Sequence, residues 1–130
     1  MNAEQWRALA GQVDTPAYVF DLDDLKRRMH LIRSALFERA QICYAVKANP
    51  FLTGPLTGEV DSFELCSPGE VRICERAGAQ REQMVISGVY KEEADLIHFF
   101  KEGEPLPLFT VESEKQLSLL SDLAGRYGRR

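Results

Sequence analysis

Short apolar runs of strand length alternate with helix signals along most of this chain, and this order restricts the folds that it can form. The apolar runs cover residues 42–46, 60–66, 84–86 and 108–111. A helical pattern precedes the first run, and helical patterns follow the other three. Strands and helices that alternate across short connections are typical of a parallel α/β fold, either an open doubly wound sheet or part of a barrel. The periodicity alone leaves both architectures open.

Capping residues mark where three of these helices should begin. Asp21 can cap the first helix, and serines at positions 67 and 113 each begin a capping box, Ser-Pro-Gly-Glu and Ser-Glu-Lys-Gln. In such a box the serine side chain accepts a hydrogen bond from the third helical residue, whose own side chain accepts one from the serine backbone. A further helix is expected over residues 92–101. Gly78 should end the helix that follows Ser67.

The helix after Asp21 carries a continuous apolar stripe. Its members recur at alternating three- and four-residue spacing: Leu22, Leu25, Met29, Ile32 and Leu36. This spacing places them along one side of a helix. We therefore expect that side to face the core.

Charge and hydropathy exclude several classes of partner. A formal net charge of −4 and a pI near 5.2 disfavour nucleic acid, because phosphate binding needs a basic surface. No run approaches the roughly 18 apolar residues of a membrane span. Residues 1–11 also lack the basic and apolar regions of a secretion signal. We therefore expect no membrane partner and a cytoplasmic location.

The cysteines do not form a metal-binding or disulfide pattern. Cys43, Cys66 and Cys74 are odd in number and lack a paired Cys-x-x-Cys spacing. We expect reduced, buried thiols and no metal site.

Lys47 occupies a position where side chains of a barrel carry chemistry. It follows the apolar run 42–46 directly, and residues at the carboxyl ends of barrel strands face the active site. A partly desolvated lysine there would have a lowered pKa, which would leave its amine available to form a Schiff base with an aldehyde. Judged by position alone, a solvated lysine is the commoner interpretation.

The sequence around Lys47 resembles a known motif. Residues 44–50, Tyr-Ala-Val-Lys-Ala-Asn-Pro, resemble the motif around the pyridoxal-phosphate (PLP) lysine in the ornithine, arginine and diaminopimelate decarboxylases, whose fold is an alanine-racemase-like barrel. The resemblance extends to residues 15–21, to the run Phe-Glu-Leu-Cys-Ser at 63–67, and to Gly69, Glu70 and Gly78. It implies an α/β fold that is about half of a TIM-type parallel β/α barrel. Residues 1–130 would form the N-terminal part of a PLP-binding barrel domain, as a single, incomplete domain.

The resemblance also implies roles for individual residues. Lys47 would form the Schiff base with PLP, and Glu64 matches an acidic residue, usually Asp, that lies near the lysine and the cofactor. Ser67 and Glu70 are better explained as helix caps than as catalytic groups. His30 and His98 are interpreted as histidines on helix surfaces.

The implied activity is that of a PLP-dependent carboxy-lyase acting on a small basic or diamino acid, with diaminopimelate as the first choice. A complete barrel has eight strands and about 250 residues, so this chain alone is expected to be inactive. We expect a homo-oligomer or a complementing C-terminal half as its partner. The alternatives are a PLP-dependent racemase or PLP carrier, which the Pro50 after Ala-Asn disfavours, and a non-catalytic half-barrel that serves as an interaction module.

Overall fold

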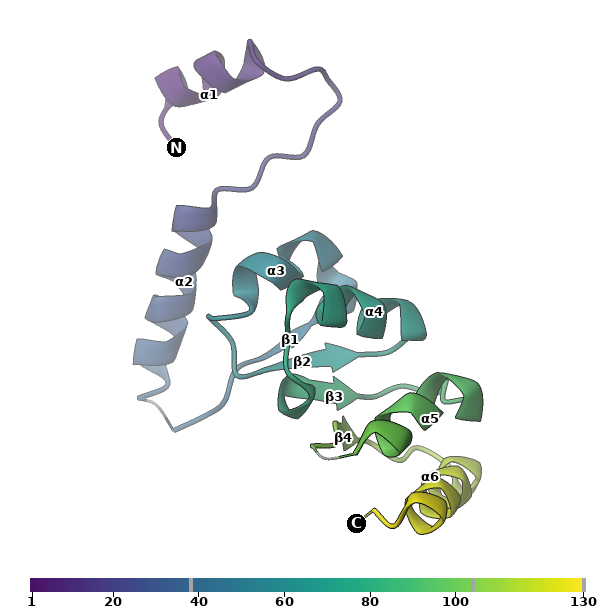
Figure 1. The fold of residues 1–130 in the computed structure, drawn as a ribbon. Coiled ribbons are helices and arrows are strands. Elements are labelled where there is room, and N and C mark those ends of the chain that lie inside the picture. Colours follow the sequence, from purple (N-terminus) through teal and green to yellow (C-terminus); the bar gives the residue numbers. More distant parts are fainter. Residues whose placement is uncertain (38, 104, 130) are drawn as a thin grey trace. The chain divides into compact units, whose positions relative to one another are not determined.

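The computed structural model describes residues 1–37, 39–103 and 105–129. The chain divides into two compact units, residues 1–36 and residues 37–130. The first unit contains helices α1 (Ala3–Ala10) and α2 (Leu22–Ala35) and the segment between them (Figure 1). Asp21 caps α2 as predicted, since its side chain accepts a hydrogen bond of 3.0 Å from the backbone N–H of Asp24.

The apolar stripe predicted for residues 22–36 lies along α2, and its packing against a core stays a prediction. Met29 is buried, but Leu22, Ile32 and Leu36 are 43%, 47% and 38% exposed. Within residues 1–36 the other helix is α1, which has no buried residue. Within this unit, α1 therefore does not form a buried core with α2.

The second unit is built on a sheet of four parallel strands. The strands are β1 (Cys43–Ala45), β2 (Ser62–Leu65), β3 (Met84–Ile86) and β4 (Leu108–Phe109). Their order in the sheet is β1-β2-β3-β4, the same as in the chain. Barrel strands follow this sequential order, whereas a doubly wound sheet reverses its order at a switch point. The structure therefore confirms the partial barrel.

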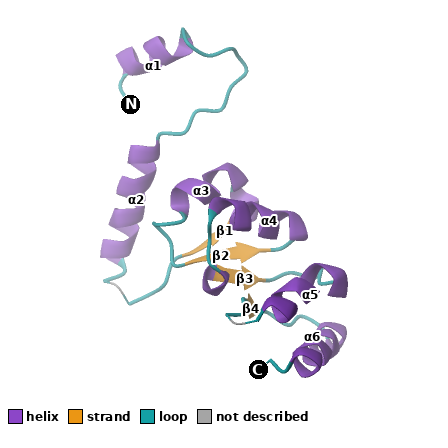
Figure 2. Cartoon of the chain, in the orientation of Figure 1, coloured by secondary structure: helices purple, strands orange, loops and turns teal. Residues whose placement is uncertain are grey.

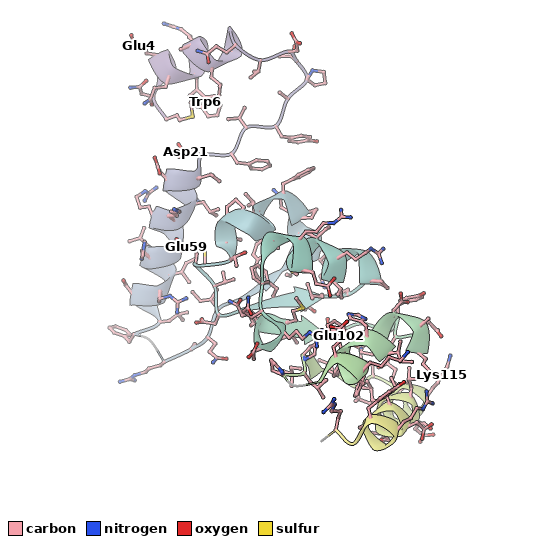
Figure 3. The ribbon with its side chains drawn as sticks, viewed as in Figure 1. Glu4, Trp6, Asp21, Glu59, Glu102 and Lys115 are labelled. Carbon is pink, nitrogen blue, oxygen red and sulfur yellow. The ribbon has the colours of Figure 1, made fainter. Side chains whose placement is uncertain are left out.

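Helices follow each of these strands, and those after β1, β2 and β3 lead to the next strand. They are α3 (Thr53–Leu56), α4 (Pro68–Ala77), α5 (Glu93–Glu102) and α6 (Glu114–Tyr127), with 3-10 turns at Val46–Ala48, Pro50–Leu52 and Arg81–Gln83. The short helix α3 was not predicted, because its sequence Thr-Gly-Pro-Leu is typical of a loop. Two labelled side chains of α5 and α6 form ion pairs: Glu102 pairs with Arg81, and Lys115 Nζ lies 3.9 Å from Glu92 Oε1 (Figure 3).

The two faces of the sheet differ in character. Phe63, Leu65, Met84 and Ile86 point to one face and are buried. Helices α3 and α4 lie beside β1 and β2 (Figure 2), and α4 contacts both α3 and β2. The strand residues whose side chains point to the opposite face are less buried, and one of them, Leu108, is 64% exposed. The core therefore lies between sheet and helices, and the other face is open.

The capping boxes predicted at α4 and α6 form only in part. Ser67 Oγ accepts a hydrogen bond from the N–H of Glu70 at 3.3 Å, as predicted, but Glu70 Oε2 accepts one from Cys66 at 2.8 Å and not from Ser67. In α6, Ser113 caps Gln116 in the same way, and the Gln116 side chain accepts from Glu112. Both serine caps have extended backbones, with φ of −151° and −159°. In both helices the returning side chain bonds to the residue before the cap.

Gly78 ends α4 as predicted. Its φ of 82° lies in the left-handed region, which glycine adopts without strain. The N–H of Gly78 donates to the carbonyl of Glu75 at 3.1 Å, and the N–H of Ala79 donates to that of Cys74 at 3.0 Å. These bonds satisfy carbonyls of the last turn.

Candidate active site

Lys47 lies where β1 ends, in the 3-10 turn Val46–Ala48. Its side chain is 58% exposed, and its Nζ lies 3.5 Å from Glu64 Oε2 and 3.6 Å from Cys66 Sγ. The parallel register pairs Ala45 of β1 with Glu64 of β2. Lys47 and Cys66, each two residues further along, therefore lie next to each other just beyond the ends of these strands. The two predicted site residues, Lys47 and Glu64, are thus brought together at the carboxyl end of the sheet.

Two further side chains complete this group. Ser87 follows β3 and donates a hydrogen bond from Oγ to Glu64 Oε1 at 2.8 Å. Cys66 Sγ lies 3.4 Å from Ser87 Oγ and 3.8 Å from Glu64 Oε1. Lys47, Glu64, Cys66 and Ser87, which we call the strand-end cluster, therefore form one connected set from three neighbouring strands.

The charges of the strand-end cluster stabilise one another. The pKa of Lys47 is raised above its usual value, first by the charge of Cys66 and then by that of Glu64. The expected lowering of this pKa is therefore wrong, because an exposed ammonium beside anionic groups gains more from their charge than it loses by desolvation. The pKa of Glu64 is lowered, chiefly by the hydrogen bond from Ser87, with a smaller contribution from Lys47. At neutral pH the two therefore form an ion pair.

The loop after β3 is held firmly next to this cluster. Gly88, with a φ of 81°, donates from its N–H to Glu112 Oε1 at 2.7 Å. Its carbonyl accepts hydrogen bonds from Lys91 Nζ at 2.6 Å and from Gln116 Nε2 at 3.2 Å. Lys91 is only 4% exposed, and burial lowers its pKa. Ser87 is therefore followed by a loop whose backbone is held by hydrogen bonds to three side chains.

The sequence did not identify Ser87, Lys91 or the role of Cys66. Cys66 was expected to be a buried thiol, yet it is only partly buried and belongs to the cluster. Cys43 was also expected to be buried but is exposed, because it starts the edge strand β1 on the open face. Cys74 is buried as predicted. The register could have revealed Ser87, since it lies one step beyond the pairing of Leu65 with Ile86.

The remaining candidates occupy helical positions. Ser67 and Glu70 contribute to the start of α4, as expected for helix caps. His98 lies on α5, partly exposed, with Nε2 3.4 Å from Glu75 Oε1 of α4, and His30 is exposed on α2. Both histidines are therefore on helices, as predicted. Of the helices in the described part of the chain, none is both long and apolar enough to span a membrane.

Comparison with known proteins agrees with this geometry. Residues 22–128 match the model of the pyridoxal-dependent decarboxylase family, specifically its pyridoxal binding domain. The chain belongs to this family. The match confirms the predicted family and its cofactor, PLP.

Individual decarboxylases show the same likeness. The chain is 38% identical over 127 residues to a diaminopimelate decarboxylase of Aquifex aeolicus, covering 95% of this chain and 29% of that protein. For a diaminopimelate decarboxylase of Vibrio cholerae the identity is 35%, with 92% of this chain and 29% of that protein covered. The chain thus spans less than a third of the length of these relatives.

Solved structures share the fold. The crystal structure of AQ1208 from Aquifex aeolicus matches with a TM-score of 0.81 and 34% identity, over 96% of this chain and 31% of that one. Diaminopimelate decarboxylase from Helicobacter pylori, complexed with L-lysine, matches with a TM-score of 0.76 and 25% identity, over 95% of this chain and 32% of that one. These matches support the partial barrel.

Proposed function

We propose that residues 1–130 form the N-terminal part of the PLP-binding barrel domain of an amino acid decarboxylase, with Lys47 as the residue that holds PLP. The observation that carries this proposal is the pairing of Lys47 Nζ with Glu64 Oε2 at 3.5 Å, at the carboxyl end of a parallel sheet. Active sites of β/α barrels lie at this end. The family match covers both residues.

The exposed amine of Lys47 fits the aldehyde of PLP. Its 58% exposure leaves it open to a cofactor, while Glu64 and Cys66 lie on one side of it. When bound, PLP supplies an electron sink for the electron pair that is left when the substrate loses its carboxylate as carbon dioxide. The groups that anchor the phosphate and the ring are expected in the part of the family's length that this chain does not span.

The residues of the cluster control the proton on Lys47. Only the neutral amine can attack an aldehyde, and the raised pKa of Lys47 means that the ammonium predominates at neutral pH. Glu64 is positioned to hold this proton and can exchange it with water. Attachment of PLP to Lys47 should therefore become faster as the pH rises toward the pKa of the lysine.

We propose diaminopimelate as the substrate, within the class of basic and diamino acids. Support comes from the two relatives described above and from a lysine/ornithine decarboxylase of Selenomonas ruminantium, which is 30% identical over 98 residues. These relatives favour a decarboxylase over the racemase and carrier alternatives. A homo-oligomer or a complementing C-terminal segment, and a cytoplasmic location, remain part of the proposal.

Reductive trapping tests the assignment of Lys47. The chain is incubated with PLP, alone and together with the C-terminal segment of the Aquifex aeolicus relative, then reduced with borohydride and mapped by peptide mass spectrometry. We expect the pyridoxyl label on Lys47 and its loss in Lys47→Ala. A label that falls instead on Lys26 or Lys91 would contradict the assignment.

A further inference from the structure

The two carboxylate oxygens of Glu64 have different partners, and one of these partners is Ser87. Its side chain donates to Oε1 at 2.8 Å, and Oε2 faces Lys47 Nζ at 3.5 Å. Ser87 is only 7% exposed, whereas the Glu64 side chain is 32% exposed. The buried hydroxyl therefore anchors a carboxylate that water can still reach.

The position of Ser87 itself is fixed by its surroundings. The N–H of Ser87 donates to the carbonyl of Leu65 at 2.9 Å, which continues the pairing of β2 with β3. The next residue, Gly88, is bonded on both sides, by Glu112 at its N–H and by Lys91 at its carbonyl. A Cβ at Gly88 would lie 3.4 Å from Cys66 Cβ, so the loop packs closely against the end of β2. Ser87 thus presents its hydroxyl from a rigid backbone.

Glu64 needs such an anchor because its side chain is long. A glutamate has more freely rotating bonds than an aspartate, and holding it in one rotamer costs conformational entropy. A hydrogen bond to an ionised acceptor is stronger than one between neutral groups and can offset that cost. Of the side-chain contacts of Glu64, the bond from Ser87 is shorter than those with Lys47 and Cys66.

We propose that Ser87 is a positioning residue for Lys47, which acts by holding Glu64 so that Oε2 faces the amine. This inference rests on the proposed function of Lys47 for its biological meaning. The contacts among Ser87, Glu64 and Lys47 involve residues of this chain alone. Their effect on the pKa values of Glu64 and Lys47 can be measured without PLP.

The test is a pH titration of the chain by NMR, following the carboxyl carbon of Glu64 and the Cε of Lys47. In Ser87→Ala we expect the pKa of Glu64 to rise and that of Lys47 to fall, each toward its ordinary value. Ser87→Thr keeps the hydroxyl and should retain both wild-type pKa values. The matched control is Ser62→Ala, which removes a hydroxyl from the same strand and the same face as Glu64 and should change neither.

Wild-type titration of both groups in a folded Ser87→Ala variant would overturn the positioning role. If Ser87→Ala does not fold, Ser87→Cys keeps a small side chain with a weaker donor. It should then shift both pKa values in the same directions, and unchanged values would overturn the role. Failure of the proposed function has a different signature, which is the absence of the pyridoxyl label from Lys47 in the wild-type protein.

Discussion

The carboxylate of Glu70 accepts a hydrogen bond from the backbone N–H of Cys66 at 2.8 Å, so the first turn of α4 is tied to the end of β2. Cys66 also contacts Lys47 and Ser87 through its side chain. A residue that sequence patterns assign to helix capping therefore also restrains the backbone beneath the strand-end cluster. The helix start and the candidate active site share one structural element.

Glu70→Ala should destabilise the protein by about 1–3 kcal/mol, because the partly buried N–H of Cys66 would lose its acceptor. Glu70→Gln keeps a side-chain oxygen at the same distance along the side chain and should cost less. Denaturant unfolding of the two variants measures the difference. Equal losses would show that the charge of Glu70, and not its hydrogen bond, stabilises the start of α4.

Ser67→Ala should damage stability more than chemistry. Loss of an N-cap serine costs about 1 kcal/mol, and Ser67 Oγ caps α4 through the N–H of Glu70. PLP capture by Lys47 should persist in this variant. Lys47→Ala should show the opposite result, with a stable fold and no capture, and each variant serves as the control for the other in denaturant melts and borohydride trapping. A Ser67→Ala protein of full stability that cannot capture PLP would place Ser67 in the active site.

The three thiols should react in a defined order. Cys43 is exposed and should react first with a thiol reagent at pH 8, and the partly buried Cys66 should follow. Burial, with the charges of Glu70 and Glu75, raises the pKa of Cys74 from 9.0 to about 11, so it should react only on unfolding. The unfolded thiol ionises at lower pH than the folded one. The contribution of Cys74 to stability is therefore complete below pH 9.0 and is lost as the pH rises toward about 11.

Labelling kinetics followed by mass spectrometry would establish this order. Cys43→Ser should remove the fast phase, and Cys74→Ser should remove only the phase that appears on unfolding. Rapid labelling of Cys74 in the folded protein would contradict its buried position.

The isolated chain should self-associate through its sheet. β1 and β4 are the edge strands, and Leu108 on β4 is 64% exposed on the open face. Exposed strand edges with apolar side chains favour pairing with another chain, and a lysine on an edge strand opposes it. Leu108→Lys should therefore shift sedimentation profiles toward the monomer. Leu117→Lys is a matched control on α6, where the leucine is 54% exposed, and a monomeric wild type at all concentrations would contradict the prediction.

The sequence was most informative where a few neighbouring residues determine the structure. The caps at Asp21, Ser67 and Ser113 and the stop at Gly78 form as predicted, because each depends on contacts within one turn. The predicted contacts of the Glu70 and Gln116 side chains were wrong by one residue, since each accepts from the N–H of the residue before the cap.

Features that depend on strand pairing could be predicted only in part. The motif predicts Lys47 as the cofactor lysine and the resemblance indicates Glu64, but no local pattern distinguishes Ser87 from other serines. Its role appears only when β3 is paired with β2 and its hydroxyl is placed against Glu64. The raised pKa of Lys47 has the same origin, since both of its charged neighbours lie on β2 or directly after it.

The register of β1 against β2 restricts how the length of this chain can vary. Tyr44 pairs with Phe63, and Ala45 pairs with Glu64, with successive side chains pointing to opposite faces. Deletion of a single residue within β2 would exchange those faces, so that Phe63 would reach solvent and the Glu64 carboxylate would be placed under the helices. Insertions and deletions should therefore be tolerated in the connections but not in the strands. The lengths of these short strands, as much as the identities of their residues, keep Lys47 and Glu64 on the same side of the sheet.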